Sequence, residues 1–367
     1  ISYASYRLVS ILEECLTHYQ PDLIVLCTGQ NEFLEERTYG DIKYASKPIS
    51  WVRGQLGSWP LYQVMGQGWD QLRMLSGEQA SVRSESLRPI LPSEVDAFLD
   101  YENGLEAYHW DPEWRRGVTE HFERNVERMG RLCDEASVPL VILSPPVNLR
   151  SSPPFKSEHR ADLSAAALDE WQRVVAKARS LYSEAPRDAI RWLQKAIDLD
   201  PQYGDTHFAL GTLLEGMGRR YEARKSLVRA KELDICPLRI LEPQRSALTR
   251  IANQYGLPFV DLHAFLEERS DYLSLGSDLL VDHVHPSIRG HQMIAGEVVR
   301  LFLAEGWVKS SERDWSEREE EIFSEHMDSL GAAYYVQGKL RLENLRLWTQ
   351  GRTDGLPLEL KPAMVVE

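Results

Sequence analysis

The chain has little that would assign it to a specialised class of protein. It has four cysteines with no CxxC pair among them, which predicts free thiols, mostly buried, in place of disulfides or metal ligands. It contains no run of 18 apolar residues, so no membrane-spanning helix is expected. Basic residues are outnumbered 42 to 56 by acidic ones, and the net charge of −14 argues against nucleic acid or anionic lipid as the main partner.

The sequence also lacks an initiating methionine and begins at Ile1, inside a helical pattern. We therefore expect that an N-terminal portion is missing. A leader or membrane anchor in that portion would determine whether the protein is in the cell envelope or the cytoplasm, so the sequence does not give its localisation. The remaining composition, 43% hydrophobic and 27% charged over 367 residues, is that of a soluble globular protein with two or more domains.

Three stretches each pair an amphipathic helix with a short apolar strand, as in a doubly wound parallel sheet. The first pairs "SYRLVSILEECLTHYQ" with "LIVLCT", and the second pairs "PEWRRGVTEHFERNVERMGRLCDEA" with "PLVILSPP". The third pairs "RSALTRIANQYG" with "PFVDL". The predicted fold class is α/β, with three layers (α/β/α) around a parallel sheet whose strands are buried on both faces.

A helical segment with an internal repeat separates the second and third units. "AIRWLQKAIDLDP" aligns with "EARKSLVRAKELDIC" at a period of 34 residues, so that Ala189 matches Ala223 and Leu193 matches Leu227. Gly211 is expected at a close contact between two helices. The period and pattern resemble the tetratricopeptide repeat, and a plain helical hairpin insertion is the alternative. Such repeats are a candidate surface for a protein partner.

These patterns divide the chain into four parts. Residues 1–155 hold the first part of the α/β domain, with an irregular, Trp-rich excursion at 40–110. Residues 161–235 form the helical insertion, and residues 236–307 complete the α/β domain. Residues 308–367 form a helical extension, whose Tyr and Leu stripe is expected to pack against the body of the protein.

The end of the first strand, "CTGQNEF", carries the first candidate site residues. Loops that follow parallel strands meet at the ligand crevice of such sheets. There Gly29 would allow a close backbone approach, and the amide of Asn31 could donate a hydrogen bond to a developing oxyanion. Gly and Asn are also common in ordinary turns, so a plain strand-exit turn is the alternative.

The stretch "DHVHPSIRGH" carries the second set. Asp282 and His285 are three residues apart, so one turn brings the carboxylate to the imidazole. An Asp–His pair of this kind can activate a serine. His283 and His291 are expected to be structural. A metal site is the alternative, but no third firm ligand stands at zinc-like spacing, so neither metal nor cofactor is expected.

Together, GxN after a strand and DxxHP before an amphipathic helix resemble the SGNH hydrolase (GDSL-type esterase) superfamily. The resemblance covers roughly residues 1–40, 112–150 and 236–305. It implies a flavodoxin-like sheet of five parallel strands, the first of them missing here, and hydrolysis or transfer of an acyl group. It also implies His285 as general base, Asp282 as its orienting partner, and Asn31 with Gly29 at the oxyanion hole. The family pattern is GxND, and Glu32 stands here in place of the Asp.

The serine nucleophile of that family is not evident in the chain. The stretch "LGSD" at 275–278 lacks a preceding strand, Ser144 ends the wrong strand, and Ser2 and Ser5 open a helix. The sequence therefore predicts that the nucleophile lies upstream of Ile1 and that this chain alone is inactive. At the crevice edge, Asn148 and Arg150 are further candidates for substrate contact, although a solvated loop arginine is the simpler interpretation.

Three functions remain open at this point. The first is an ester hydrolase acting on an acyl ester such as an acetylated carbohydrate or a lipid. The second is an O-acyltransferase, which uses the same residues and differs in the acceptor admitted. The third is a non-catalytic tetratricopeptide scaffold beside a degenerate hydrolase-like domain.

Overall fold

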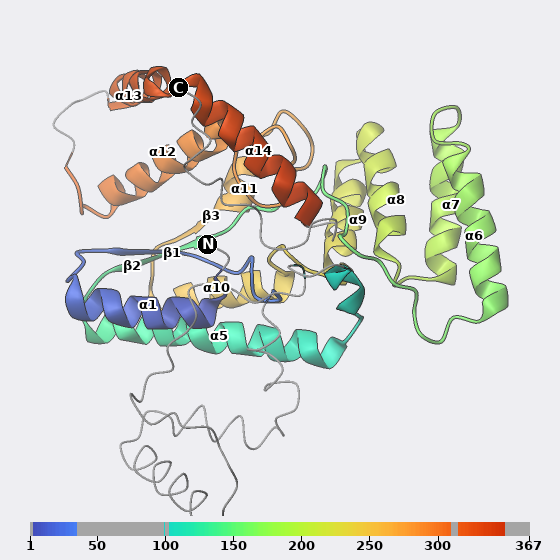
Figure 1. The fold of residues 1–367 in the computed structure, drawn as a ribbon, viewed down its shortest axis with the longest axis horizontal. Helices are drawn as coiled ribbons and strands as arrows, with labels where there is room; N and C mark the ends of the chain where they lie inside the picture. Colours follow the sequence, from blue (N-terminus) through green and yellow to red (C-terminus); the bar gives the residue numbers. More distant parts are fainter. Residues whose placement is uncertain (1–2, 35–98, 100–102, 310–314, 349–367) are drawn as a thin grey trace, which may run out of the picture.

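The computed structural model describes residues 3–34, 99, 103–309 and 315–348. This part of the chain is mixed α/β and mostly helical, around one small parallel sheet (Figure 1). The three strands are β1 (Ile24–Cys27), β2 (Leu140–Ser144) and β3 (Phe259–Asp261), in the order β1-β2-β3. Each strand lies where the sequence predicts one, and both pairings are parallel, as predicted.

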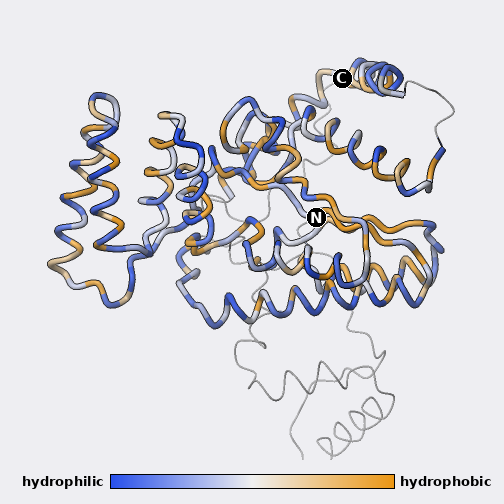
Figure 2. The backbone as a smooth tube through the Cα atoms, turned by 180° about the vertical axis from the view of Figure 1, so that it is seen from behind, coloured by the Kyte–Doolittle hydropathy of each residue, from blue (hydrophilic) through white to orange (hydrophobic). Residues whose placement is uncertain are grey.

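Helices cover both faces of this sheet (Figure 1). On one face lie α1 (Ser5–His18), α5 (Pro112–Glu135) and α10 (Glu242–Tyr255). On the other face lie α11 (Leu262–Glu267) and α12 (Ile288–Ala304), which follow β3 in the chain. The tube in Figure 2 shows hydrophobic residues running along the strands and alternating with hydrophilic ones along the helices, as expected of amphipathic elements packed on a sheet.

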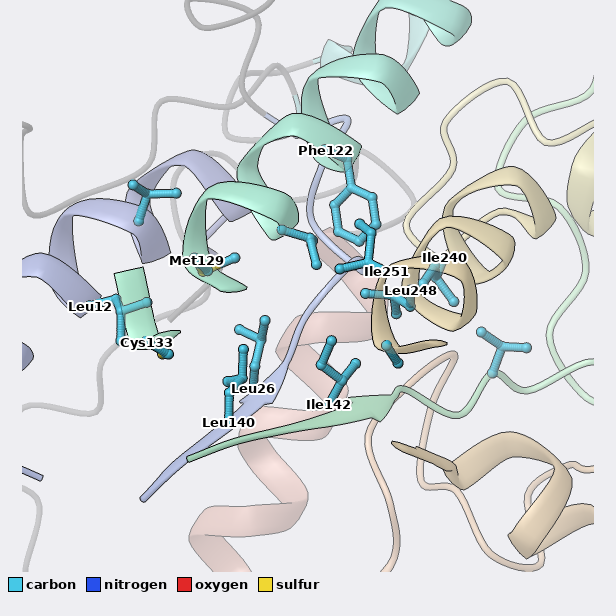
Figure 3. Close-up of a cluster of buried hydrophobic side chains, with 14 of the residues drawn as sticks. Leu12, Leu26, Phe122, Met129, Cys133, Leu140, Ile142, Ile240, Leu248 and Ile251 are labelled. Atoms are coloured by element: carbon cyan, nitrogen blue, oxygen red, sulfur yellow. The ribbon is translucent and has the colours of Figure 1, made fainter. Parts of the chain in front are cut away.

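The larger core lies between the sheet and the first set of helices (Figure 3). Leu26 and Ile142 point from the strands toward Phe122 and Met129 of α5 and Leu248 of α10. Phe122 and Leu248 are fully buried. Burial of an aromatic or aliphatic side chain of this size contributes roughly 1.5–3 kcal/mol to the stability of the fold. This layer therefore fixes the strands whose ends lead into the candidate site.

Local signals set the ends of the helices beside the sheet. The side chain of Asp111 accepts from the backbone N–H of Trp114 at 2.9 Å and begins α5, with Pro112 in the first turn. Ser287 begins α12 in the same way, accepting from Gly290 N at 3.1 Å. Gly256 ends α10 with φ +62°, a conformation that side chains with a Cβ rarely adopt.

The helical insertion consists of four helices standing side by side next to the sheet (Figure 1). They are α6 (Ala165–Arg179), α7 (Pro186–Leu199), α8 (Gly204–Gly216) and α9 (Arg220–Glu232). The residues matched across the 34-residue period, Ala189 with Ala223 and Leu193 with Leu227, are all buried. A Cβ on Gly211 would lie 2.7 Å from Leu227 Cγ, so α8 and α9 touch at this glycine, as predicted.

A buried ion pair fixes the end of this insertion to the loop that leaves β2. Arg239 Nη2 donates to Asp234 Oδ2 at 3.2 Å, and Arg239 Nη1 donates to the carbonyl oxygens of Asn148 and Ser152 at 3.0 and 2.6 Å. Both charged side chains are almost fully buried. The carboxylate also accepts from the backbone N–H of Phe155. These bonds offset the desolvation of the pair and tie the insertion to the candidate site.

Two predictions about burial are wrong. β1 is an edge strand of the described sheet, so Val25 is 43% exposed and Cys27 is exposed, although the sequence predicts both to be buried. The helix α14 (Ala332–Trp348) exposes its Tyr and Leu stripe, with Tyr334 54% exposed. Only the last turns of α14, at Leu345 and Trp348, pack against the body.

The remaining features agree with the sequence or fall outside the described residues. Helix α13 (Trp315–Ser329) lies in the expected C-terminal extension, and the four cysteines are free. None of the helices within the described ranges has the length and apolarity needed to cross a bilayer. Most of the expected excursion at 40–110 lies outside the described residues; a short 3-10 helix, η2 (Gly104–Ala107), belongs to its end.

Candidate functional site

Asp282 and His285 form a hydrogen-bonded pair in the loop before α12. His285 Nδ1 lies 2.7 Å from Asp282 Oδ2. The other carboxylate oxygen, Oδ1, accepts from the backbone N–H groups of Val284 and His285, both at 2.8 Å. The aspartate side chain is 5% exposed and the histidine side chain 60%. The carboxylate is thus fixed from two sides, and the second ring nitrogen of His285, Nε2, is left for other partners.

The pair shifts the titration of both members in opposite directions. The hydrogen bond that His285 donates to the Asp282 carboxylate raises the pKa of His285 above its usual 6.5. Although burial acts to raise it, the pKa of Asp282 falls to about 2 because His285 donates to it and His283 and His285 lie close. An ionised aspartate on Nδ1 fixes the histidine tautomer with a free Nε2, which is the form that accepts a proton from a nucleophile.

Asn148 holds the Asp282 loop from behind. Its backbone N–H donates to His283 O at 2.9 Å, and its side-chain amide donates to Asp282 O at 2.8 Å. Its side-chain oxygen accepts from Ser151 N at 2.8 Å. Asn148 is 2% exposed and lies outside the candidate cavity described below. The structure therefore places this predicted substrate contact in a position that orients the loop backbone.

Arg150, the other predicted substrate contact, lies against the helical insertion. Its guanidinium forms an ion pair with Asp278 at 2.8 Å, lies 3.9 Å from Glu215 of α8, and stacks over the ring of Tyr272. A Cβ on Gly276 would lie within 2.6 Å of the guanidinium. Arg150 is absent from the cavity lining and joins the insertion to the loop at residues 270–278.

The loop after β1 is shaped by Gly29 and fastened by Gln30. Gly29 has φ +122°, and a Cβ there would lie 2.6 Å from Ile240 Cδ1. Gln30 donates from Nε2 to Pro146 O at 2.9 Å and accepts from Ile240 N at 3.2 Å. Gln30 therefore joins the exits of β1 and β2 to the segment before α10, and it sets the position of the next residue, Asn31.

We predict that Gly29→Ala lowers the melting temperature markedly and moves Asn31 from the cavity. A methyl group would meet Ile240, and the φ of +122° is strained for alanine, a combination that costs on the order of 1–3 kcal/mol. Thermal unfolding followed by circular dichroism measures the change. Gly218→Ala is the matched control, because φ is +73° there but nothing lies within 4 Å of the added Cβ. Equal melting temperatures for the two variants would contradict a steric role of Ile240.

Glu32, which departs from the GxND pattern, binds the first residue of α1. Its carboxylate accepts from the backbone N–H and the hydroxyl of Ser5, both at 2.8 Å, and the residue is fully buried. Asn125 of α5 donates to the same hydroxyl at 3.0 Å. A carboxylate at a helix N-terminus is favoured by the helix dipole. The glutamate thus links the candidate site loop to α1, and Asn31 lies beside this link.

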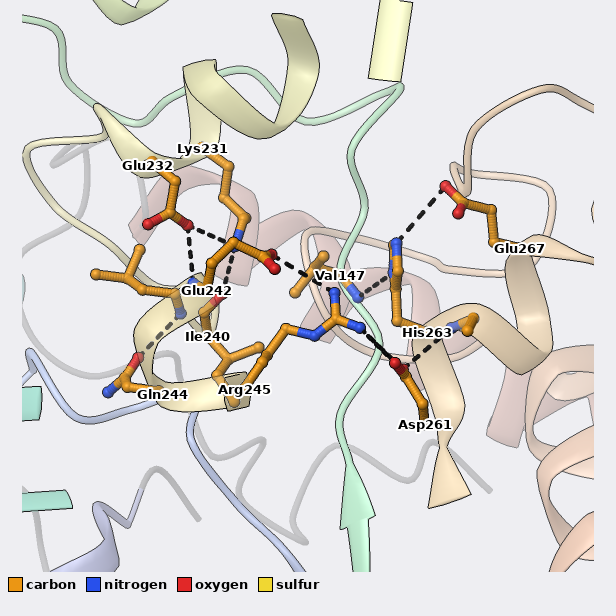
Figure 4. A network of polar contacts seen from close by, with 12 residues as sticks. Val147, Lys231, Glu232, Ile240, Glu242, Gln244, Arg245, Asp261, His263 and Glu267 are labelled. Atoms are coloured by element: carbon orange, nitrogen blue, oxygen red, sulfur yellow. Dashed lines mark hydrogen bonds and ion pairs between the residues drawn. The ribbon is translucent and has the colours of Figure 1, made fainter. Parts of the chain in front are cut away.

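A polar network surrounds the exits of β2 and β3 (Figure 4). His263 of α11 is fully buried, and its Nδ1 lies 3.4 Å from the backbone N–H of Val147. Arg245 of α10 donates to both oxygens of Asp261 at 2.9 and 2.7 Å. Lys231 of α9 donates to Ile240 O at 2.7 Å. These contacts fix the backbone on which Gln30 and Asn148 depend.

One cavity of about 340 Å³ brings the two sequence motifs together. It is lined by Asn31 from the loop after β1 and by His285 and His291 from the loop and first turns at α12. Gly29 shapes the Asn31 loop without lining the cavity. Asn31 has no side-chain hydrogen bond to another described residue, so its amide is left for a ligand. An aspartate-paired histidine and an asparagine amide therefore line one cavity, although they are far apart in the sequence.

The described part of the cavity lining contains no serine. Its one nucleophilic side chain there is Cys27, and the surrounding protein atoms raise the pKa of this thiol to about 11, although the residue reaches solvent. A thiol with that pKa is protonated at neutral pH and is a weak nucleophile. Ser144 is buried at the end of β2 and does not line the cavity, and Ser2 lies outside the described residues.

His283 and His291 flank the Asp282–His285 pair. Burial lowers the pKa of His283 to about 3, and its ring packs edge-on against Phe155 at 5.0 Å. Burial also lowers the pKa of His291. Among the described residues, no group of three or more His, Cys, Asp or Glu side chains is placed to hold a metal ion. Both histidines are neutral wall residues at neutral pH.

Several residues that line or shape the cavity were not predicted from the sequence. Leu345 and Trp348 of α14 close one side of it, and Leu238 forms part of the floor. Gln30 stands between two predicted site residues, but the sequence indicated no role for it. The apolar end of the last helix was the available signal for Leu345 and Trp348, but periodicity does not show where a C-terminal helix docks.

Comparisons with known proteins add no relative to this geometry: no protein-family model, curated protein or solved structure matches the chain.

Proposed function

We propose that this chain carries the base, the orienting residue and the oxyanion donor of a serine ester hydrolase of the SGNH type. The observation that carries the proposal is the Asp282–His285 hydrogen bond beside a cavity that Asn31 also lines. Carboxylate-oriented histidines next to an amide donor are the arrangement that acyl transfer to serine requires. The resemblance of both motifs to the same superfamily supports this assignment.

The mechanism needs a serine from outside the described residues, and we propose that it lies upstream of Ile1. Its hydroxyl oxygen attacks the ester carbonyl carbon while His285 Nε2 takes the hydroxyl proton. Asp282 stabilises the resulting imidazolium, and the Asn31 amide donates to the negative oxygen of the tetrahedral intermediate. His285 then gives the proton to the leaving alcohol. Water repeats these steps on the acyl-serine and releases the acid.

We also propose that α6–α9 form a tetratricopeptide-like insertion. Burial of equivalent residues in α7 and α9, and the contact at Gly211, support a repeated helix pair. Repeats of this kind bind protein segments, so we propose a protein partner for this insertion. The carboxylate of Glu215 on α8 lies near Arg150, so such a partner would bind close to the site loops.

The test is an assay of ester hydrolysis and acyl transfer on this chain and on a form extended upstream in its reading frame. p-Nitrophenyl esters report cleavage, and a sugar acceptor added to the assay distinguishes transfer from hydrolysis. The proposal predicts cleavage by the extended form and none by the shorter chain. A folded extended form that cleaves none of the esters would favour the non-catalytic scaffold.

A further inference from the structure

The cavity beside His285 is apolar over most of its wall. Among the described residues, its apolar lining comes from β2, from the loops that follow β1 and β2, from the segments that precede α10 and α12, and from α11, α12 and α14. These apolar residues are Leu34, Leu143, Pro145, Pro146, Leu238, Leu262, Val284, Pro286, Ile294, Leu345 and Trp348. An apolar wall of this extent favours a hydrocarbon ligand, because burying such a ligand removes apolar surface from water on both sides.

Among the described residues that line the cavity, polar groups are few, and most of them already form hydrogen bonds or ring contacts. Both ends of the Gln30 amide are bonded to backbone groups of Pro146 and Ile240. Nδ1 of His285 is bonded to Asp282, and His283 is neutral and packed on Phe155. A sugar ring placed here would lose its hydrogen bonds to water and find few replacements, which costs about 1–3 kcal/mol for each unpaired hydroxyl.

The C-terminal helix forms the outer side of this cavity. Arg346 Nη2 donates to Val281 O at 3.3 Å, which fastens the end of α14 to the loop that carries Asp282. Trp348 is 5% exposed and packs in a cluster with Leu34 and Leu238. Leu345 packs on the same cluster from the preceding turn. The last turn of α14 therefore contacts both the loop that carries Asp282 and the apolar wall of the cavity.

We propose that this cavity receives an apolar acyl chain of several carbons, with Leu345 and Trp348 of α14 as its outer wall. The substrate class is an ester of a medium-length fatty acid, in preference to an acetylated sugar. The ester bond would lie at the polar end, where Asn31 and His285 line the cavity. The volume of about 340 Å³ is at the lower end of the range for small-ligand sites, as suits one such chain. Cleavage of this ester rests on the proposed function, whereas binding of the chain does not.

The binding test uses sodium decanoate and sodium acetate in isothermal titration calorimetry with this chain. Decanoate is expected to bind at least tenfold more tightly than acetate. Leu345→Trp, which fills the cavity, is expected to weaken decanoate binding about tenfold or more. Leu347→Trp is the matched control, because Leu347 lies on the same helix, is 37% exposed and does not line the cavity. Ile294→Phe narrows the cavity from α12 and gives a second variant in case Leu345→Trp does not fold.

The kinetic test uses p-nitrophenyl acetate, butyrate and octanoate with the upstream-extended form. The value of kcat/KM is expected to rise by up to about fourfold for each added methylene that the cavity buries. Unchanged decanoate binding in folded Leu345→Trp and Ile294→Phe would overturn the inference, as would a preference for acetate. Decanoate binding that depends on Leu345, with no ester cleaved, would keep the inference and reject the proposed function.

Discussion

Replacement of His285 with alanine is expected to lower kcat/KM for ester hydrolysis by the upstream-extended form by about 10⁴-fold or more. In the proposed mechanism, this one side chain both takes the proton of the attacking hydroxyl and returns it to the leaving alcohol. Loss of the base in a unit of this kind removes most of the catalytic effect at once. The fold should be preserved, because His285 is 60% exposed and its hydrogen bonds to Asp282 lie at the surface of the loop. Initial rates on a p-nitrophenyl ester measure the effect.

His291→Ala is the matched control for this prediction. His291 lines the same cavity, but Asp282 does not contact it and burial lowers its pKa. We expect His291→Ala to lower the rate of ester hydrolysis by less than about tenfold, because the variant loses only one contact of the cavity wall. If His291→Ala and His285→Ala lowered the rate equally, the base would be misassigned. If His285→Ala kept most of the activity, the proposed mechanism would be wrong.

Asp282→Asn is expected to lower kcat by about 10³- to 10⁴-fold and to move the acidic limb of the pH–rate profile to lower pH. The rate falls because an amide does not hold the histidine in the tautomer with a free Nε2. The limb moves because Asp282 is the main cause of the raised His285 pKa. The base works when neutral, so the wild-type limb lies above pH 6.5 and the variant limb moves toward or below it.

The same pair has a predicted effect on stability. The His285 contribution is fully present below pH 6.5 and is lost as the pH rises through its raised folded-state pKa. The Asp282 contribution is present above 3.8, its ordinary pKa, and is lost as the pH falls toward about 2. The pair therefore stabilises the fold most between these values, and Asp282→Asn should flatten that part of the profile. A variant with an unmoved rate limb and an unchanged stability profile would contradict the assignment of Asp282.

Short-range patterns predicted the parts of this structure that depend on neighbours in the sequence. The spacing of Phe122 and Met129 predicted the helix α5, and Gly256 predicted the C-terminal end of α10. Asp282 and His285 were paired from their separation alone, and they are hydrogen-bonded. Each of these features depends on residues within a few positions of one another, so it can be predicted from the local sequence.

The features that were missed depend on contacts between distant segments. The exposure of Val25 follows from the place of β1 at the edge of the described sheet, and an apolar run does not show how many strands flank it. Arg150 forms an ion pair with Asp278, although 128 residues separate the two in the sequence. Glu32 stands where the family pattern has aspartate, and its contact with Ser5 at the start of α1 joins segments 27 residues apart.

The central claim is that His285 activates a serine beside this cavity, and fluorophosphonate labelling tests it most directly. The reagent is applied to this chain and to its upstream-extended form, and the modified peptide is mapped by mass spectrometry. The account predicts label on one upstream serine in the extended form, lost in His285→Ala and kept in His291→Ala. No label on the folded extended form, or label on a serine within residues 1–367, would contradict it.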